Sequence, residues 1–289
     1  MSVMRSYSKG IQDALLRPKA AFLFWAVNAL FGVFVYSQVA GALSQILARS
    51  LAGEALMKGS AVETLAEIMT APGAPIAGFI RMVVVLFALY VFVAPFLYGG
   101  VLNDLVRPRE VIGFGASFWA SGGKYYGRFF RLEILSILLW IPSAAVYFVA
   151  DKVFAAAAPD PQAEQIRFYL ILARIVLALF LFFMMKMTVD YARIRIAVTE
   201  THGTLGALLW AIVFVVRKLL KSLLLYYLLG ITALLGLALY LGLHSFIAET
   251  TTGGVLIGLF LTELHIFWRC FIKVAYQGAQ VRFYLLEAS

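Results

Sequence analysis

Charged residues are scarce in this sequence. Asp, Glu, Lys and Arg together make up 13% of its 289 residues, whereas hydrophobic residues make up 63%. Ordinary soluble domains carry about a quarter charged residues and about half apolar ones. The shortage of charge therefore excludes a sizeable water-soluble domain.

Cysteine and histidine are scarce as well. The single cysteine, Cys270, excludes an intramolecular disulfide and a cysteine-based metal cluster. The three histidines lie far apart, and the sequence contains no HExxH, GxSxG or phosphate-binding glycine motif. We therefore predict a protein without metal, cofactor or enzymatic activity.

Six stretches of the chain are apolar for as long as an α-helix needs to cross a bilayer, about 20 residues for a core roughly 30 Å thick. They lie at 20–43, 77–102, 133–150, 166–192, 222–246 and 254–281. Ala40-Gly41-Ala42 has the small-residue pattern of a signal-peptidase site, but we expect the first stretch to remain as an uncleaved span. The sequence thus predicts an all-α fold, a polytopic transmembrane helix bundle of six spans in a single membrane domain, residues 1–289.

The net charge of +9 is distributed unevenly along the chain. Fourteen Lys and Arg residues lie before the first span and in the connections after the second and fourth spans, whereas four lie in the other connections. Because connections rich in Lys and Arg stay in the cytoplasm, we expect both termini there. Topology, and attraction to anionic lipid headgroups, explain the charge without a nucleic-acid partner.

The spans are arranged as three two-span repeats, with boundaries at 1–106, 107–198 and 199–289. The last span of each repeat ends in a similar short motif. The three motifs are Tyr98-Gly99-Gly100-Val101, Tyr191-Ala192-Arg193-Ile194 and Tyr276-Gln277-Gly278-Ala279. An even number of spans in each unit predicts parallel repeats, related by an axis along the membrane normal.

Each repeat opens with an amphipathic segment, and residues 114–132 show the pattern best. On a helix, the Ser, Lys and Arg side chains of this segment form one stripe and aromatic side chains occupy much of the remainder. We expect an in-plane interfacial helix, interrupted at Gly122-Gly123. The more apolar segment 205–220 is expected to be either interfacial or re-entrant. The residues predicted at the membrane surface are Trp119, Lys124, Arg128, Arg131, Arg217, Lys218 and Lys221.

Ionisable residues within the spans form the candidate site, because they are costly in lipid and generally face the bundle interior or a water-filled cavity. Lys186, Asp190 and Arg193 share one helix face, and so do His265, Arg269 and Lys273. The whole candidate cluster is Glu133, Lys186, Asp190, Arg193, Glu263, His265, Arg269 and Lys273. Its excess of cations suits an anionic headgroup. The alternative is a set of structural ion pairs between helices.

Three short motifs carry a family resemblance: Phe118-Trp119, Tyr125-Tyr126-Gly127-Arg128 and Asp190-Tyr191-Ala192-Arg193-Ile194-Arg195. With these motifs, the chain resembles uncharacterised bacterial six-span membrane proteins and is distantly similar to the membrane domain of glycerophosphodiester phosphodiesterases. The resemblance implies a bacterial protein that is integral to the cytoplasmic (inner) membrane. It does not imply phosphodiesterase activity, since the chain has no soluble phosphodiesterase domain.

We therefore expect a non-enzymatic integral membrane protein that interacts with lipid, anionic lipid in particular, or serves as a membrane-embedded subunit of a larger complex with protein partners. Two alternatives stay open: a transporter of a small anionic or lipidic solute, and a lipid-modifying enzyme with Glu263 or Asp190 as base. A wide cavity at the membrane midplane would favour transport. A groove that opens sideways to lipid would favour lipid handling.

Overall fold

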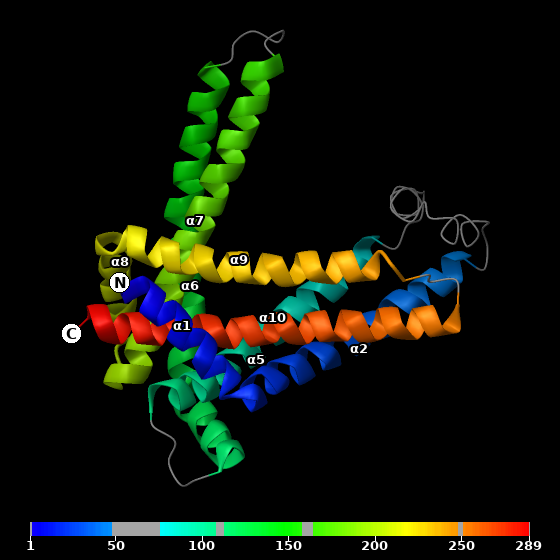
Figure 1. The fold of residues 1–289 in the computed structure, drawn as a ribbon. Helices are drawn as coiled ribbons and strands as arrows, with labels where there is room; N and C mark the ends of the chain where they lie inside the picture. The colour runs from blue at the N-terminus through cyan, green and yellow to red at the C-terminus, as the bar shows by residue number, and fades with distance from the viewer. Residues whose placement is uncertain (1, 48–75, 108–112, 158–163, 248–250, 289) are drawn as a thin grey trace. The chain divides into compact units, whose positions relative to one another are not determined.

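A computed structural model describes residues 2–47, 76–107, 113–157, 164–247 and 251–288. In these ranges every regular element is an α-helix (Figure 1). The helices are α1 (Ser2–Leu15), α2 (Pro18–Leu47), α5 (Ile76–Val106), α6 (Phe114–Ala157), α7 (Glu164–Thr199), α8 (Thr204–Arg217), α9 (Leu219–His244) and α10 (Thr252–Glu287). The predicted all-α class is confirmed.

Six of these helices are long and apolar enough to cross a membrane: α2, α5, α6, α7, α9 and α10. They coincide with the six apolar stretches of the sequence, so the polytopic helix bundle is confirmed. The threefold repeat, the single domain and the cytoplasmic location of the termini stay predictions.

Contacts divide the chain into two compact units, Met1–Phe22 with Ala94–Ser289 and Leu23–Val93. Helices α2 and α5 each begin in one unit and end in the other. In its described part, the smaller unit consists of helical segments with exposed apolar side chains, among them Leu30, Val33 and Phe87. The larger unit contains the polar networks described below.

The core of the larger unit is concentrated in particular parts of its helices. Its large, fully buried side chains include Tyr125, Phe129, Tyr191, Ile194, Leu225, Leu229 and Phe283. By contrast, α7 has no buried side chain between Phe168 and Met184. The helices thus pack on protein along one stretch and present apolar side chains outward along another, which is the pattern expected of lipid-facing surface.

Helix α1 packs on α10 through small residues (Figure 1). A Cβ atom added at Gly10 would lie 2.5 Å from the Cβ of Ala279, so a larger residue would force the helices apart. The buried residues of α1 recur every three or four positions and form one face. Near the ends of the chain, the hydroxyl of Ser2 donates a hydrogen bond to Glu287 at 2.8 Å.

The predicted interruption of the segment 114–132 at Gly122-Gly123 is wrong, whereas its in-plane position stays a prediction. This segment is the first part of α6, which continues without interruption for 44 residues. The helix continues through Gly122, and the missing side chain there provides room for a neighbouring ring. A Cβ at this position would lie 2.7 Å from Phe96. The inward-facing aromatic side chains of the segment are buried in protein and not among headgroups; they are Phe118, Tyr125 and Phe129.

Helix α8 packs along α7 with one face and leaves its other face open. Ala207, Ala211 and Phe214 are buried, whereas Leu205 and Leu209 are exposed. At Lys218 the backbone leaves helical geometry (φ −114°, ψ 25°), and α9 begins at the next residue. The segment 205–220 is therefore not surrounded by protein. Its interfacial or re-entrant position stays a prediction.

Candidate functional site

A network of buried charges connects α6 and α7. Arg193 of α7 is only 6% exposed and forms ion pairs with Glu133 of α6 and with Asp190, the latter at 3.2 Å. An unpaired charge is costly in such a place, so the two carboxylates compensate the guanidinium. Three residues of the predicted cluster thus come together as ion pairs.

Asp190 also joins α7 to α9 and α10. Its second carboxylate oxygen accepts hydrogen bonds from the hydroxyl of Tyr226 at 2.6 Å and from the side-chain amide of Gln280 at 3.2 Å. That amide donates to the Tyr226 hydroxyl as well. Neutral partners therefore share the negative charge with Arg193, and four helices meet at this point.

Lys273 contacts the same region through an aromatic ring. The ring of Tyr98 on α5 has the Arg193 guanidinium 4.3 Å from its centroid and the Lys273 ammonium 5.0 Å from it. Cations are attracted to the electron-rich face of such a ring. Tyr98 thus lies between two positive charges that come from different helices.

Three other members of the predicted cluster lie further along α10, and Lys186 lies one turn before Asp190 on α7. Lys186 and Arg269 are exposed and form no ion pair with another described residue. His265 stacks on Tyr240, with ring centroids 4.8 Å apart. Glu263 lies two positions before His265 on α10. The predicted cluster therefore comprises residues of two different places, which are the buried ion-pair network and a region further along α10.

His265 and Arg269 line a cavity of about 590 Å³ between α7, α9 and α10. Most of its wall is apolar, with Phe183, Leu223, Ile231, Ala233, Leu234 and Leu237 among the lining residues. The Nδ1 atom of His265 is buried and has no hydrogen-bond partner in the described part of the chain. The cavity therefore combines a mainly apolar wall with two basic side chains, His265 and Arg269.

Two tyrosines connect the cavity to the ion-pair network. Tyr226 and Tyr276 both line the cavity, and the Tyr276 hydroxyl donates a hydrogen bond to the backbone carbonyl of Tyr226 at 2.8 Å. Tyr226 also donates a hydrogen bond to Asp190. Its side chain therefore belongs both to the cavity wall and to the ion-pair network. A ligand in the cavity would contact the wall that the buried network holds in position.

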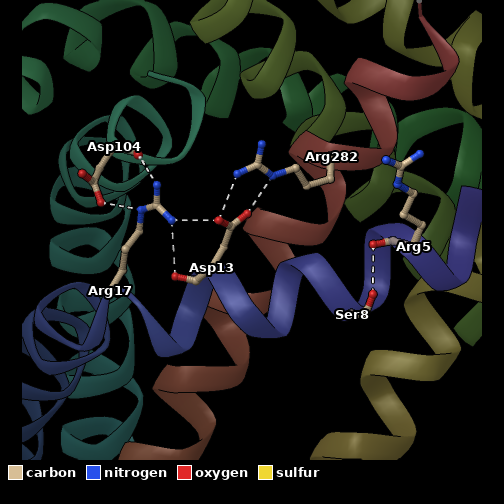
Figure 2. A network of polar contacts seen from close by, with 6 residues as sticks. All are labelled: Arg5, Ser8, Asp13, Arg17, Asp104 and Arg282. Carbon is tan, nitrogen blue, oxygen red and sulfur yellow. Dashed lines mark hydrogen bonds and ion pairs between the residues drawn. The ribbon is translucent and has the colours of Figure 1, made fainter. Parts of the chain in front are cut away.

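A second polar network, which sequence reasoning missed, holds α1 in place (Figure 2). Asp13 accepts hydrogen bonds from Arg282 at 2.8 and 3.0 Å and from Arg17 at 2.9 Å. Arg17 also donates to Asp104 at 2.8 Å. The available signal was the position of Asp13 on the same face of α1 as Val3 and Gly10, where a carboxylate requires a buried partner.

The surroundings of Asp13 change its pKa. Burial alone would raise the pKa of the carboxyl group, but the hydrogen bonds and positive charge of Arg282 and Arg17 outweigh burial and hold the pKa below the usual 3.8. Asp13 is therefore charged throughout the physiological pH range.

The residues predicted at the membrane surface have two kinds of environment. Trp119, Arg131 and Arg217 are exposed, which leaves them free to meet headgroups. Lys124 and Arg128 contact Glu200, and Lys218 and Lys221 each donate to Glu287 at 2.7 Å. No group of three or more His, Cys, Asp or Glu side chains is placed to hold a metal ion in the described ranges.

No family model, curated protein or solved structure matches this chain. The resemblance to the membrane domain of glycerophosphodiester phosphodiesterases therefore stays a prediction. Six apolar helices define the class, an integral membrane protein, and its function has to be argued from the cavity and the networks.

Proposed function

We propose that this integral membrane protein binds a phosphate-bearing, anionic lipid in the cavity between α7, α9 and α10, and that it does so without catalysing a reaction. The observation that carries the proposal is the composition of the cavity. Arg269 and His265 are among its lining residues, and the rest of the lining is mainly apolar. An amphiphile with a negative headgroup matches both parts.

The cavity opens toward the side on which lipid would lie. Tyr227, Ile231 and Leu234 line it and are also 53, 53 and 62% exposed. They belong to α9, a helix apolar enough to span a membrane. A lipid chain could therefore lie against α9 while its headgroup reaches Arg269.

The size and chemistry of the cavity favour binding over catalysis. Ligand pockets commonly measure about 300 to 1,000 Å³, so 590 Å³ accommodates a headgroup with part of an acyl chain. None of the described lining residues is Asp, Glu, Ser, Thr or Cys. A nucleophile paired with a general base, which hydrolysis would use, is not among them.

Arg269 offers the sharpest test. Since it is exposed and has no ion-pair partner among the described residues, Arg269→Gln should leave the fold intact. In detergent micelles with equal amounts of phosphatidylglycerol and phosphatidylethanolamine, native mass spectrometry should find phosphatidylglycerol retained preferentially by the unaltered protein. The variant should retain about tenfold less, the effect of one charge-assisted hydrogen bond.

Arg5→Gln is the matched control, because it removes the same charge from an exposed position on α1, outside the cavity. It should retain phosphatidylglycerol like the unaltered protein. Equal retention by all three proteins would contradict the proposal. Movement of the bound lipid between leaflets of proteoliposomes would favour the transporter, and release of a free headgroup would favour the lipid-modifying enzyme.

We also propose the predicted architecture for this protein: three parallel repeats with both termini in the cytoplasm of a bacterial inner membrane. Packing supports it, because the opening segment of each repeat lies on the closing helix of another. Helix α1 packs on α10, and α8 packs on α7. The first part of α6 packs on α5, where a Cβ at Gly99 would lie 3.2 Å from Tyr125. The same arrangement recurs three times.

A further inference from the structure

The end of α7 carries an unusual backbone conformation. Glu200, the residue after the last helical position, has a φ of 53°, and it is the one non-glycine residue with positive φ in the described part of the chain. This left-handed region is uncommon for residues other than Gly, Asn and Asp, and it costs free energy that the surroundings must offset. The contacts of Glu200 identify those surroundings.

Cationic side chains from two segments, and a histidine from a third, gather around Glu200. Its carboxylate forms ion pairs with Arg107, which follows α5, and with Lys124 of α6, the latter at 2.9 Å. Its backbone carbonyl accepts a hydrogen bond from Arg128 at 3.1 Å. A nitrogen of the same guanidinium lies 3.5 Å from Nε2 of His202. Two cations thus pair with the Glu200 carboxylate, a third binds its backbone carbonyl, and His202 lies beside that third cation.

An aromatic ring holds two of these cations in position. The Lys124 ammonium and the Arg128 guanidinium lie 5.4 and 5.9 Å from the centroid of the buried Tyr125 ring. Their positions therefore depend on the packed core as well as on Glu200. The cluster remains accessible, since the side chains of Lys124 and Glu200 are 41 and 44% exposed.

Glu287 provides an instructive contrast. It also pairs with two lysines, Lys218 and Lys221, and accepts a hydrogen bond from Ser2. However, its side chain is only 9% exposed and it belongs to the regular helix α10. Glu287 thus forms ion pairs that connect α10 to the start of α9, and its side chain is largely shielded from solvent. Glu200 is an exposed carboxylate in a strained conformation, and the cations around it outnumber it.

We propose that Arg107, Lys124, Arg128 and His202 form a second, separate anion site for a phosphate group, and that the Glu200 carboxylate occupies this site in the absence of the ligand. Phosphate has more acceptor oxygens and more charge than a carboxylate, so it can pair with more of these donors at once than the Glu200 carboxylate does. The phosphate belongs either to a lipid headgroup or to a soluble molecule. Both sources present the same chemistry to the four side chains.

The test uses the purified full-length chain in detergent with two probes. Pyrophosphate binding is measured by titration calorimetry, and retention of phosphatidylglycerol against phosphatidylcholine is measured by native mass spectrometry. Glu200→Gln removes the competing charge and should strengthen binding of one probe about tenfold. The double variant Lys124→Gln/Arg128→Gln should weaken binding of the same probe by about tenfold or more.

Two controls make the result specific. Asp151→Asn also removes one carboxylate from an ion pair, in this case with Arg174, and it should leave binding of both probes unchanged. Arg269→Gln should leave the gain from Glu200→Gln intact, so failure of the cavity proposal and failure of this one are distinguishable.

The source of the phosphate follows from which probe responds. A response to pyrophosphate indicates a soluble ligand, and a response to phosphatidylglycerol alone indicates a lipid headgroup. The proposal is overturned if Glu200→Gln lowers the free energy of unfolding without any gain in binding, or if the double variant binds both probes as Asp151→Asn does.

Discussion

Replacing Arg193 by Gln should destabilise the protein strongly. The guanidinium is nearly inaccessible to solvent, pairs with Glu133 and Asp190, and lies over the ring of Tyr98. Its removal leaves two carboxylates without their common cation. Removing one partner of a buried pair typically costs about 3 to 5 kcal/mol, because the remaining charge is uncompensated. Equilibrium unfolding in mixed detergent micelles would measure the loss.

A comparison with Arg174→Gln makes this prediction specific. Arg174 pairs with Asp151 at 2.9 Å, but the two side chains are 31 and 40% exposed. Solvent screens such a pair, which is worth about 0 to 1 kcal/mol. A loss for Arg193→Gln no larger than that for Arg174→Gln would refute the interpretation of Arg193 as a structural tie.

A double variant tests the mechanism of the loss. Glu133→Gln combined with Arg193→Gln removes one uncompensated carboxylate, so it should recover part of the stability lost in the single variant. The retained lipid should be the same in all of these variants. A fall in bound phosphatidylglycerol together with unchanged stability would instead place an anionic headgroup at Arg193.

Three further predictions concern α1 and the orientation of the chain. Gly10→Val should destabilise the protein by about 2 kcal/mol or more in unfolding measurements, since its side chain would overlap α10, whereas Gly206→Ala, in open space, should not. The pKa of Asp13 is lowered, so its contribution should be complete above the usual carboxyl range and lost as pH falls through the folded-state pKa; the stability difference between the unaltered protein and Asp13→Asn, measured from pH 7 to pH 3, should shrink at the acidic end. A cysteine at exposed Ser245 should react with an impermeant thiol reagent added outside intact cells and one at exposed Ser8 should not; the reverse labelling would overturn the orientation.

The sequence predicted the six spans well, because an apolar stretch of sufficient length has few alternatives in a bilayer. It predicted the start of α6 poorly. The pair Gly122-Gly123 was interpreted as a helix breaker, yet Gly122 makes room for Phe96, a residue on another helix. Only the tertiary structure distinguishes a glycine that weakens a helix from one that lets a neighbour approach.

The candidate cluster shows the same limit. Helical spacing places Asp190 and Arg193 one turn apart, and the structure pairs Arg193 with both Asp190 and Glu133. Spacing carries no information about partners across helices, so it did not reveal that Lys273 lies over the ring of Tyr98. Tyr226 and Gln280, the neutral partners of Asp190, gave no signal because polar uncharged residues are common.

The contact between α1 and α10 has a consequence for biosynthesis. Asp13 and Arg282 are 269 positions apart, and at about 5 to 20 residues per second the first helix waits on the order of tens of seconds for its partner to leave the ribosome. During that time its inward face, with Val3, Ser6 and Gly10, lacks the surface on which it finally packs. A chain that ends before α10 would expose this face permanently, and cellular quality control could thereby distinguish incomplete chains from finished ones.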